Sequence, residues 1–396
     1  MILQGILLLV ALVLVPLGLA EVATRILTRA LPENGMPAFF GVPLVPYRPE
    51  PAQVLAWAER SRASTYVGPD PDLGWSIVPN GRTPDGLYEA NAQGARARPD
   101  VVYGATPPPG TRRIVTVGDS FTHGDRVSNE ETWERQLEGL RADLEVVNFG
   151  VPGYGTDQAV LRWRRDAAKL SSDVAILGIW PENLCRNLNV IRYFMQPASG
   201  FSQKPRFVET DRGLEVIGQP VLTGDALARA VTDPFASPLV ANDRWAIASD
   251  LTPASWQQLR VARVLATLLR ARARRAMRER IYAGTDPSGI ALTVAIAAQW
   301  TREVAESGAA SHVLLIPQRE LLETYPDENS FPLARALREA GLEPIDLGPP
   351  MTREVRARGA DCCYGPDGHL TVEGNALVAR WLLERLAGTL DAAGRS

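Results

Sequence analysis

Cysteine, histidine and lysine are all scarce in this chain of 396 residues. Its three cysteines are too few for a disulfide framework, and none has the Cys-x-x-Cys or Cys/His spacing of a metal site. Only two lysines occur, so nearly all positive charge is arginine. The formal net charge of −3 argues against a nucleic-acid binder and implies no polyanionic partner. Any chemistry that needs an imidazole must use one of three histidines, His123, His312 or His369.

The first segment has almost no polar side chains. Residues 2–20 contain only one, Gln4, and as a helix they would extend roughly 28 Å, close to the ~30 Å of a bilayer core. A helix inside a soluble core is rarely apolar on every face. Residues 18–20 resemble a signal-peptide cleavage site, but no basic residue precedes the apolar run. We therefore favour an uncleaved transmembrane anchor in residues 1–30 over a cleaved signal peptide.

The rest of the chain divides into a lead-in and a domain with regular alternation. Residues 31–110 are rich in proline and glycine, which predicts an irregular layer. Residues 111–390 alternate short apolar strands with helices, which predicts an α/β fold. We expect a three-layer, doubly wound (flavodoxin-like) parallel sheet covered by helices on both faces. The expected strands are 114–117, 145–148, 173–180, 313–317 and 344–347, and the expected helices are 132–140, 156–170, 290–307, 333–340 and 372–386.

An insertion, residues 187–287, interrupts this alternation after the third strand. Its second half, residues 255–280, reads as a helix with eight arginines. A solvated basic face is one interpretation, because charge runs usually have that role. The alternative is contact with anionic lipid headgroups or with membrane-protein partners.

Chemistry-bearing residues follow the predicted strands, where ligands of open α/β sheets bind. Ser120 ends the first strand with an exposed hydroxyl and a backbone N–H that faces a developing oxyanion. Gly153 lies after the second strand, and the Asn183 amide lies after the third. Asp367 and His369 precede the last helix. Together they supply a nucleophile, oxyanion donors, a base and an orienting carboxylate, which are the roles that acyl transfer needs.

Four sequence blocks carry a resemblance to a known family. GDSFTHG, NFGVPGYGTDQ, ENLCRN and DGHLTVEGN resemble the four blocks of the SGNH subgroup of GDSL esterases and lipases. The resemblance covers about residues 112–385 without the insertion, and the lead-in is similar to that of bacterial membrane-anchored members. It implies that Ser120 is the nucleophile, His369 the base and Asp367 its partner. It also implies that the oxyanion donors are Ser120, Gly153 and Asn183.

The sequence departs from the family pattern at two of these blocks. The third usually reads Gly-x-Asn-Asp, whereas residues 181–184 read Pro-Glu-Asn-Leu. The last often has aspartate three residues before histidine, but that position is Pro366. Asp367 is two residues before His369, and Asp361 is the substitute if Asp367 points away.

Each chosen residue also has a structural interpretation. Ser120 could cap the following helix, and Asn183 could form a turn. His123 lies one helical turn after Ser120, so it could line the pocket, but that spacing does not suit a base. His312 directly precedes a predicted strand and is interpreted as structural. Asp125 and Arg126 are interpreted as rim or surface charges.

The function expected from these residues is that of a membrane-anchored serine esterase. It would act on an ester or an O-acylated envelope glycan and would need no cofactor and no metal. The alternatives are a polysaccharide O-acyltransferase with the same residues and a catalytically idle SGNH-like subunit of a larger membrane complex. Arg25 and Arg29 after the anchor favour a cytoplasmic body by the positive-inside rule. The resemblance implies instead a periplasmic or extracytoplasmic domain, and we expect that location.

Overall fold

The computed structural model describes residues 2–322 and 331–392, and the chain divides into two compact units. Unit 1 comprises Met1–Ser61, Asn189–Gln203 and Leu222–Glu279. Unit 2 comprises Arg62–Leu188, Lys204–Val221 and Arg280–Ser396. Most of the predicted insertion therefore folds with the first 61 residues, and the later part of the lead-in folds with the sheet.

Unit 2 is built on a five-stranded parallel sheet in the order β12-β11-β8-β6-β7. Read from β7 and counted in chain order, this is 2-1-3-4-5, the flavodoxin-like order. The predicted fold class is confirmed. The strands are β6 (Arg112–Val117), β7 (Leu144–Asn148), β8 (Val174–Ile179), β11 (Ala310–Leu315) and β12 (Ile345–Asp346).

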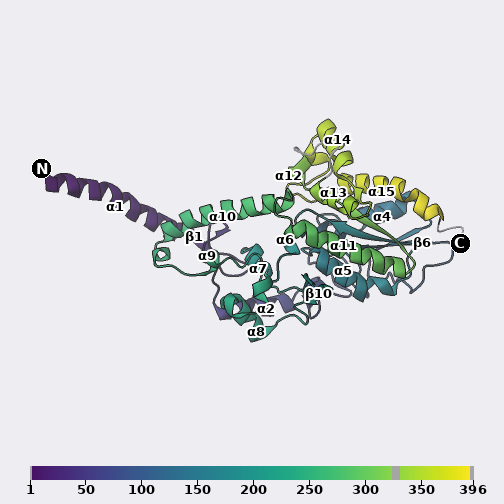
Figure 1. Ribbon diagram of the computed structural model, residues 1–396, viewed down its shortest axis with the longest axis horizontal. Coiled ribbons are helices and arrows are strands. Elements are labelled where there is room, and N and C mark those ends of the chain that lie inside the picture. Colours follow the sequence, from purple (N-terminus) through teal and green to yellow (C-terminus); the bar gives the residue numbers. More distant parts are fainter. Residues whose placement is uncertain (1, 323–330, 393–396) are drawn as a thin grey trace. The chain divides into compact units, whose positions relative to one another are not determined.

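Helices cover both faces of this sheet, as Figure 1 shows. The helices α4 (Trp133–Leu140) and α15 (Val372–Ala392) pack together on one face, and α5 (Thr156–Arg165) and α11 (Ser288–Glu306) on the other. Because both faces are covered, β8 is buried along its whole length, as its uninterrupted apolar sequence predicts. A continuous core including Ile114, Trp133 and Leu382 joins the sheet to α4 and α15.

Shorter elements complete unit 2. In the described residues of this unit, two antiparallel pairs lie outside the main sheet, and further helices lie between its strands or follow the last of them. These elements are β4 (Val67–Asp70) with β5 (Gly74–Ile77), β9 (Arg206–Thr210) with β10 (Gly213–Ile217), α3 (Ser120–His123), α6 (Asn183–Arg186), α12 (Arg319–Leu322), α13 (Pro332–Glu339) and α14 (Gly348–Arg358).

Unit 1 begins with α1 (Ile2–Leu27), a helix long and apolar enough to cross a membrane. Residues 31–110, which were expected to be irregular, contain α2 (Pro51–Arg62). Pro51 is the first helical residue, where the missing N–H costs nothing and the fixed φ suits a helix. Proline therefore begins a helix here instead of breaking one. The other elements of this unit are β1 (Thr28–Ala30), β2 (Pro37–Phe39), β3 (Val42–Pro43), α7 (Arg192–Met195), α8 (Gly224–Thr232) and α9 (Ala248–Leu251).

The arginine-rich segment forms α10 (Arg260–Tyr282), and its arginines differ in environment. Arg274 is buried and donates to Asp250 and to the Phe194 carbonyl, at 2.7 Å each. Arg263 donates to the Val45 carbonyl at 2.6 Å. Arg275, by contrast, is 83% exposed. Part of the predicted basic face therefore holds unit 1 together, and contact of residues 255–280 with lipid or a membrane-protein partner stays a prediction.

Candidate active site

Ser120 lies at the point where β6 gives way to the short helix α3. Asp119 caps this helix, because its carboxylate accepts a hydrogen bond from the Phe121 backbone N–H at 2.9 Å. Phe121 is part of the core of unit 2, so its side chain anchors the turn between β6 and α3 to that core. Ser120 itself is only 6% exposed. As the first residue of α3, it has no intrahelical carbonyl to accept its N–H.

His369 approaches Ser120 from the loop before α15. Its Nε2 lies 3.0 Å from Ser120 Oγ, although 249 positions separate the two residues in the chain. The imidazole packs against Phe121 with ring centroids 5.2 Å apart, and Phe121 stacks on Trp180 at 5.1 Å. The predicted nucleophile and the predicted base are thus adjacent, and the aromatic ring of Phe121 packs against the imidazole.

Asp367 orients the imidazole from its other nitrogen. Its Oδ2 lies 3.2 Å from His369 Nδ1 and also accepts a hydrogen bond from Arg126 Nε. Burial would raise the pKa of Asp367, but the hydrogen bonds from Arg126 and His369 outweigh it and hold the pKa below its usual range. An ionised carboxylate only accepts hydrogen bonds, so Nδ1 carries the proton and Nε2 is free to accept from the serine hydroxyl.

Asp361, the substitute considered for this role, does not reach His369. Its carboxylate is 89% exposed and pairs with Arg319 at 2.6 Å. The tight turn at Gly368, with φ of 84°, brings Asp367 and His369 side by side instead. The spacing of two residues, a departure from the family pattern, is therefore compatible with an orienting carboxylate.

The loop after β7 runs beside the loop after β6. Backbone hydrogen bonds join Phe149 to Thr116 at 2.9 Å and Val151 to Gly118 at 3.1 Å. Gly153 follows with φ of 81°, a left-handed conformation that favours glycine. Gly150 also has to be a glycine, because a Cβ there would lie 2.3 Å from the His123 backbone nitrogen. Gly153, the second predicted oxyanion donor, thus lies on a loop that is hydrogen-bonded to the loop of Ser120.

Asn183 begins α6 and is almost fully buried. Its side-chain amide donates to the Tyr154 carbonyl at 2.8 Å and to Asp119 Oδ2 at 3.1 Å. Its Oδ1 accepts from the Trp180 backbone N–H at 2.6 Å. Both amide hydrogens are therefore engaged in this structure. To serve as an oxyanion donor, Asn183 must release one of these two hydrogen bonds.

A buried ion cluster supports this side of the site. Arg186 donates to Asp119 at 3.3 Å, to the Tyr154 carbonyl at 3.0 Å and to Glu182 at 2.7 Å. Burial raises the pKa of Asp119 in spite of this partner. We did not predict Asp119, Glu182 or Arg186 from the sequence. The usable pattern is that Arg186 lies three residues after Asn183 on one short helix, so both face Asp119.

His123 and Asp125 form a second His–Asp pair beside the first. His123 is fully buried; its Nδ1 lies 2.6 Å from Asp125 Oδ1 and its Nε2 lies 2.7 Å from the Tyr66 hydroxyl. Burial, together with Arg96, lowers the pKa of His123 to about 4. His123 contacts Asp125 and Tyr66 and does not contact Ser120 Oγ as a base would. Asp125 and Arg126 are not surface charges alone, because both make contacts in the site.

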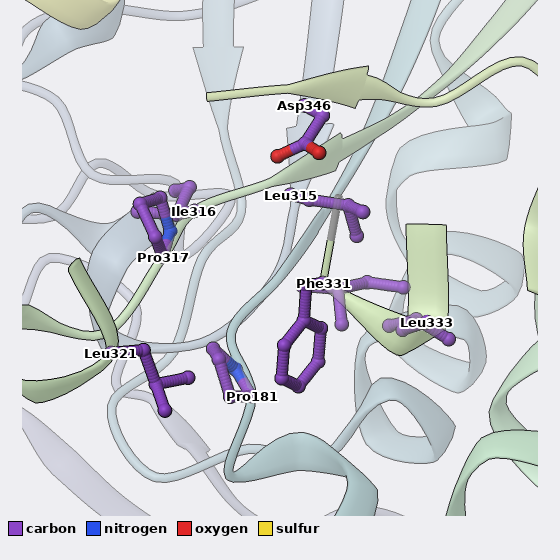
Figure 2. Close-up of a pocket in the computed structure, with 9 residues that line it drawn as sticks. Pro181, Leu315, Ile316, Pro317, Leu321, Phe331, Leu333 and Asp346 are labelled. Atoms are coloured by element: carbon purple, nitrogen blue, oxygen red, sulfur yellow. The ribbon is translucent and has the colours of Figure 1, made fainter. Parts of the chain in front are cut away.

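Figure 2 shows a small apolar pocket at the carboxyl ends of β8, β11 and β12. Pro181, Leu321 and Phe331 lie in its wall, with Asp346 at one side. None of its lining residues is a nucleophile beside a base. Among residues 2–322 and 331–392, no group of three or more His, Cys, Asp or Glu side chains is placed to hold a metal ion.

Comparisons with known proteins found similar solved structures. No protein-family model and no curated protein matches the chain. Similar solved structures include a lipase/acylhydrolase from Enterococcus faecalis, which is 15% identical; the match covers 70% of this chain and 96% of that one, with a TM-score of 0.35. A lipolytic protein of the G-D-S-L family from Veillonella parvula is 14% identical, with coverages of 69% and 97% and a TM-score of 0.30. A mutant acetylxylan esterase from Geobacillus stearothermophilus is 12% identical, with coverages of 69% and 94% and a TM-score of 0.35. At these identities the chemistry has to be argued from the residues of the site.

Proposed function

We propose that this chain is a serine ester hydrolase anchored in a membrane by α1. The observation that carries the proposal is the 3.0 Å contact between His369 Nε2 and Ser120 Oγ, with Asp367 on the opposite ring nitrogen. A serine hydroxyl is a weak nucleophile unless an oriented base accepts its proton.

The reaction follows from this arrangement in two halves. Ser120 Oγ attacks the ester carbonyl carbon while His369 Nε2 takes the hydroxyl proton, and the imidazolium then protonates the departing alcohol oxygen. Water attacks the resulting acyl-enzyme, again giving a proton to Nε2, and the carboxylic acid leaves as Ser120 recovers its proton. Asp367 stabilises the imidazolium in both halves. The N–H groups of Ser120 and Gly153 and the amide of Asn183 receive the oxyanion.

The expected substrate is an O-acylated glycan of the cell envelope, in keeping with an anchor and an extracytoplasmic domain. The long apolar run of α1 supports anchoring. Protease treatment of intact spheroplasts tests the orientation: we expect digestion of the body outside the membrane. Protection that is lost only after lysis would place the body in the cytoplasm, as Arg25 and Arg29 favour.

Turnover of a simple ester tests the proposed reaction. Full-length protein in mild detergent is expected to hydrolyse 4-nitrophenyl acetate, and Ser120→Ala is expected to abolish this activity. Ser307→Ala, which changes an exposed serine at the end of α11, is the matched control and is expected to leave the rate unchanged. Absence of turnover in the parent protein, together with its purification in fixed ratio with membrane proteins, would favour the alternative of an idle structural subunit.

A further inference from the structure

Asp125 has one carboxylate oxygen held in place and the other directed toward the reacting groups. Its backbone N–H donates to the Ser120 carbonyl at 2.9 Å, which fixes the residue directly beyond α3. Oδ1 lies 2.6 Å from His123 Nδ1. Oδ2 lies 4.0 Å from His369 Nε2, the same nitrogen that contacts Ser120 Oγ. The side chain is 18% exposed, so it lies at the wall of the site with access to solvent.

A buried chain of side chains orients this carboxylate. The low pKa of His123 keeps its imidazole neutral near pH 7, so one ring nitrogen donates and the other accepts. Because a carboxylate accepts, Nδ1–H donates to Asp125 and Nε2 accepts from the Tyr66 hydroxyl at 2.7 Å. Burial raises the pKa of Tyr66, so its hydroxyl stays protonated as a donor. An acceptor oriented in advance loses little freedom when it binds a ligand.

The position of Asp125 Oδ2 near His369 Nε2 indicates which part of a bound ester would lie closest to this oxygen. His369 Nε2 must reach the alcohol oxygen of the ester in order to protonate it as it leaves. That oxygen therefore lies within hydrogen-bond distance of Nε2, and Oδ2 lies close to the same point. Asp125 thus lies beside the alcohol portion of the substrate, and a hydroxyl on the carbon next to the ester-bearing carbon falls within its reach.

We propose that Asp125 is a specificity-determining residue that accepts a hydrogen bond from a hydroxyl next to the scissile ester oxygen. The inference rests on the proposed hydrolase function and deepens it: the preferred substrates are monoesters of vicinal diols and polyols. An anionic group at that position is disfavoured by the carboxylate.

A rival role for Asp125 is to stabilise the imidazolium of His369 through space. That effect would be the same for every ester, whether or not its alcohol carries a second hydroxyl. A matched pair of substrates therefore separates the two roles. 2-Hydroxyethyl acetate and propyl acetate have the same number of heavy atoms and differ by a hydroxyl in place of a methyl group.

The experiment measures kcat/KM for both acetates with full-length protein in detergent. The parent is expected to prefer 2-hydroxyethyl acetate by about tenfold, the effect expected of one hydrogen bond to a charged acceptor. Asp125→Asn keeps an amide oxygen as the acceptor for His123 Nδ1–H and places an NH2 group, which cannot accept a hydrogen bond, where Oδ2 lies, so the preference is expected to vanish. Asp125→Ser is the second variant, with the same expected loss of preference. Glu130→Gln, which changes a carboxylate that is 60% exposed, is the control and is expected to keep the parent's preference.

Each other outcome overturns the proposal. Equal losses on both acetates would assign Asp125 to electrostatic support of His369, and a preference that survives both substitutions would deny it any part in recognition. Lack of preference in the parent, or turnover of neither acetate by a protein whose Ser120 reacts with a fluorophosphonate probe, would also overturn it. Failure of that probe to label Ser120 in the parent would instead count against the hydrolase function itself.

Discussion

Arg186 donates a hydrogen bond at 3.3 Å to Asp119, the residue directly before the proposed nucleophile. Both side chains are almost fully buried, with exposures of 6% for Arg186 and 2% for Asp119. Asp119 caps α3 with its other oxygen, so this ion pair fixes the peptide from which Ser120 projects. The same guanidinium reaches Glu182 and the Tyr154 carbonyl, which joins the loops after β6, β7 and β8.

Substitution of Arg186 is expected to be severely destabilising. Arg186→Gln leaves Asp119 and Glu182 as buried carboxylates without their cation, which typically costs about 3–5 kcal/mol. Denaturant unfolding of the parent and the variant measures the change. Arg275→Gln removes an exposed pair on α10 and is expected to change the free energy of unfolding by less than about 0.5 kcal/mol. Equal effects of the two substitutions would contradict the supporting role of the buried cluster.

Asp367 is expected to be the orienting carboxylate of the site. Asp367→Asn removes the charge that stabilises the imidazolium and favours the wrong imidazole tautomer, so kcat is expected to fall by about 10²–10⁴-fold. Asp361→Asn is the matched control, because that carboxylate is exposed and pairs with Arg319. Steady-state kinetics with 4-nitrophenyl acetate measures kcat for both variants and shows which carboxylate the reaction depends on. A larger loss for Asp361→Asn would reverse the assignment.

Substitution of Asn183 tests whether a side-chain amide that already donates hydrogen bonds to Asp119 and Tyr154 also stabilises the oxyanion. Its removal in Asn183→Ala is expected to lower kcat by about 10²-fold or more, the usual loss for one oxyanion donor. Some stability is expected to be lost as well, since hydrogen bonds to Tyr154 and Asp119 disappear. Kinetics of the folded fraction, quantified by circular dichroism, separates the two effects. An unchanged kcat in folded protein would make Asn183 a purely structural residue.

His123 is expected to make the fold sensitive to mild acid. Its pKa is about 4 when folded and ordinarily ~6.5 when unfolded, so between these values only the unfolded chain binds the proton. The free energy of unfolding therefore falls as pH drops from about 6.5 to 4, by roughly 3 kcal/mol from this residue. Denaturant titrations at several pH values measure the slope. His123→Asn is expected to remove this component and flatten the curve; an identical slope in parent and variant would refute the buried neutral histidine.

Much of the sheet, and the proximity of Ser120 to His369, could be predicted from the sequence because both depend on local patterns. Short apolar runs such as β8 are buried on both faces, and their order along the chain fixes a doubly wound sheet. Ser120 and His369 could be chosen because nucleophile and base must follow strands or precede helices at one edge. Asp367 was chosen on the family resemblance alone, with Asp361 kept as a substitute, because the turn at Gly368 that places Asp367 beside His369 cannot be predicted from spacing.

The supporting contacts could not be predicted because they join distant parts of the chain. The interaction of Arg126 with Asp367 links residues 241 positions apart, and that of Tyr66 with His123 links residues 57 apart. Neither pair has a spacing that would reveal it. The helix α2 was missed for a different reason: proline and glycine were frequent around it, and proline at a first helical position is locally identical to proline in a loop.

The most direct test of the central claim is to locate the adduct of a fluorophosphonate probe on full-length protein by peptide mass spectrometry. A serine activated by His369 is expected to react, so the adduct should lie on Ser120. His369→Ala is expected to slow labelling strongly, whereas substitution of His312, which lies on β11, by asparagine is not expected to slow it. An adduct on another serine, or Ser120 labelling at the same rate without His369, would contradict the account.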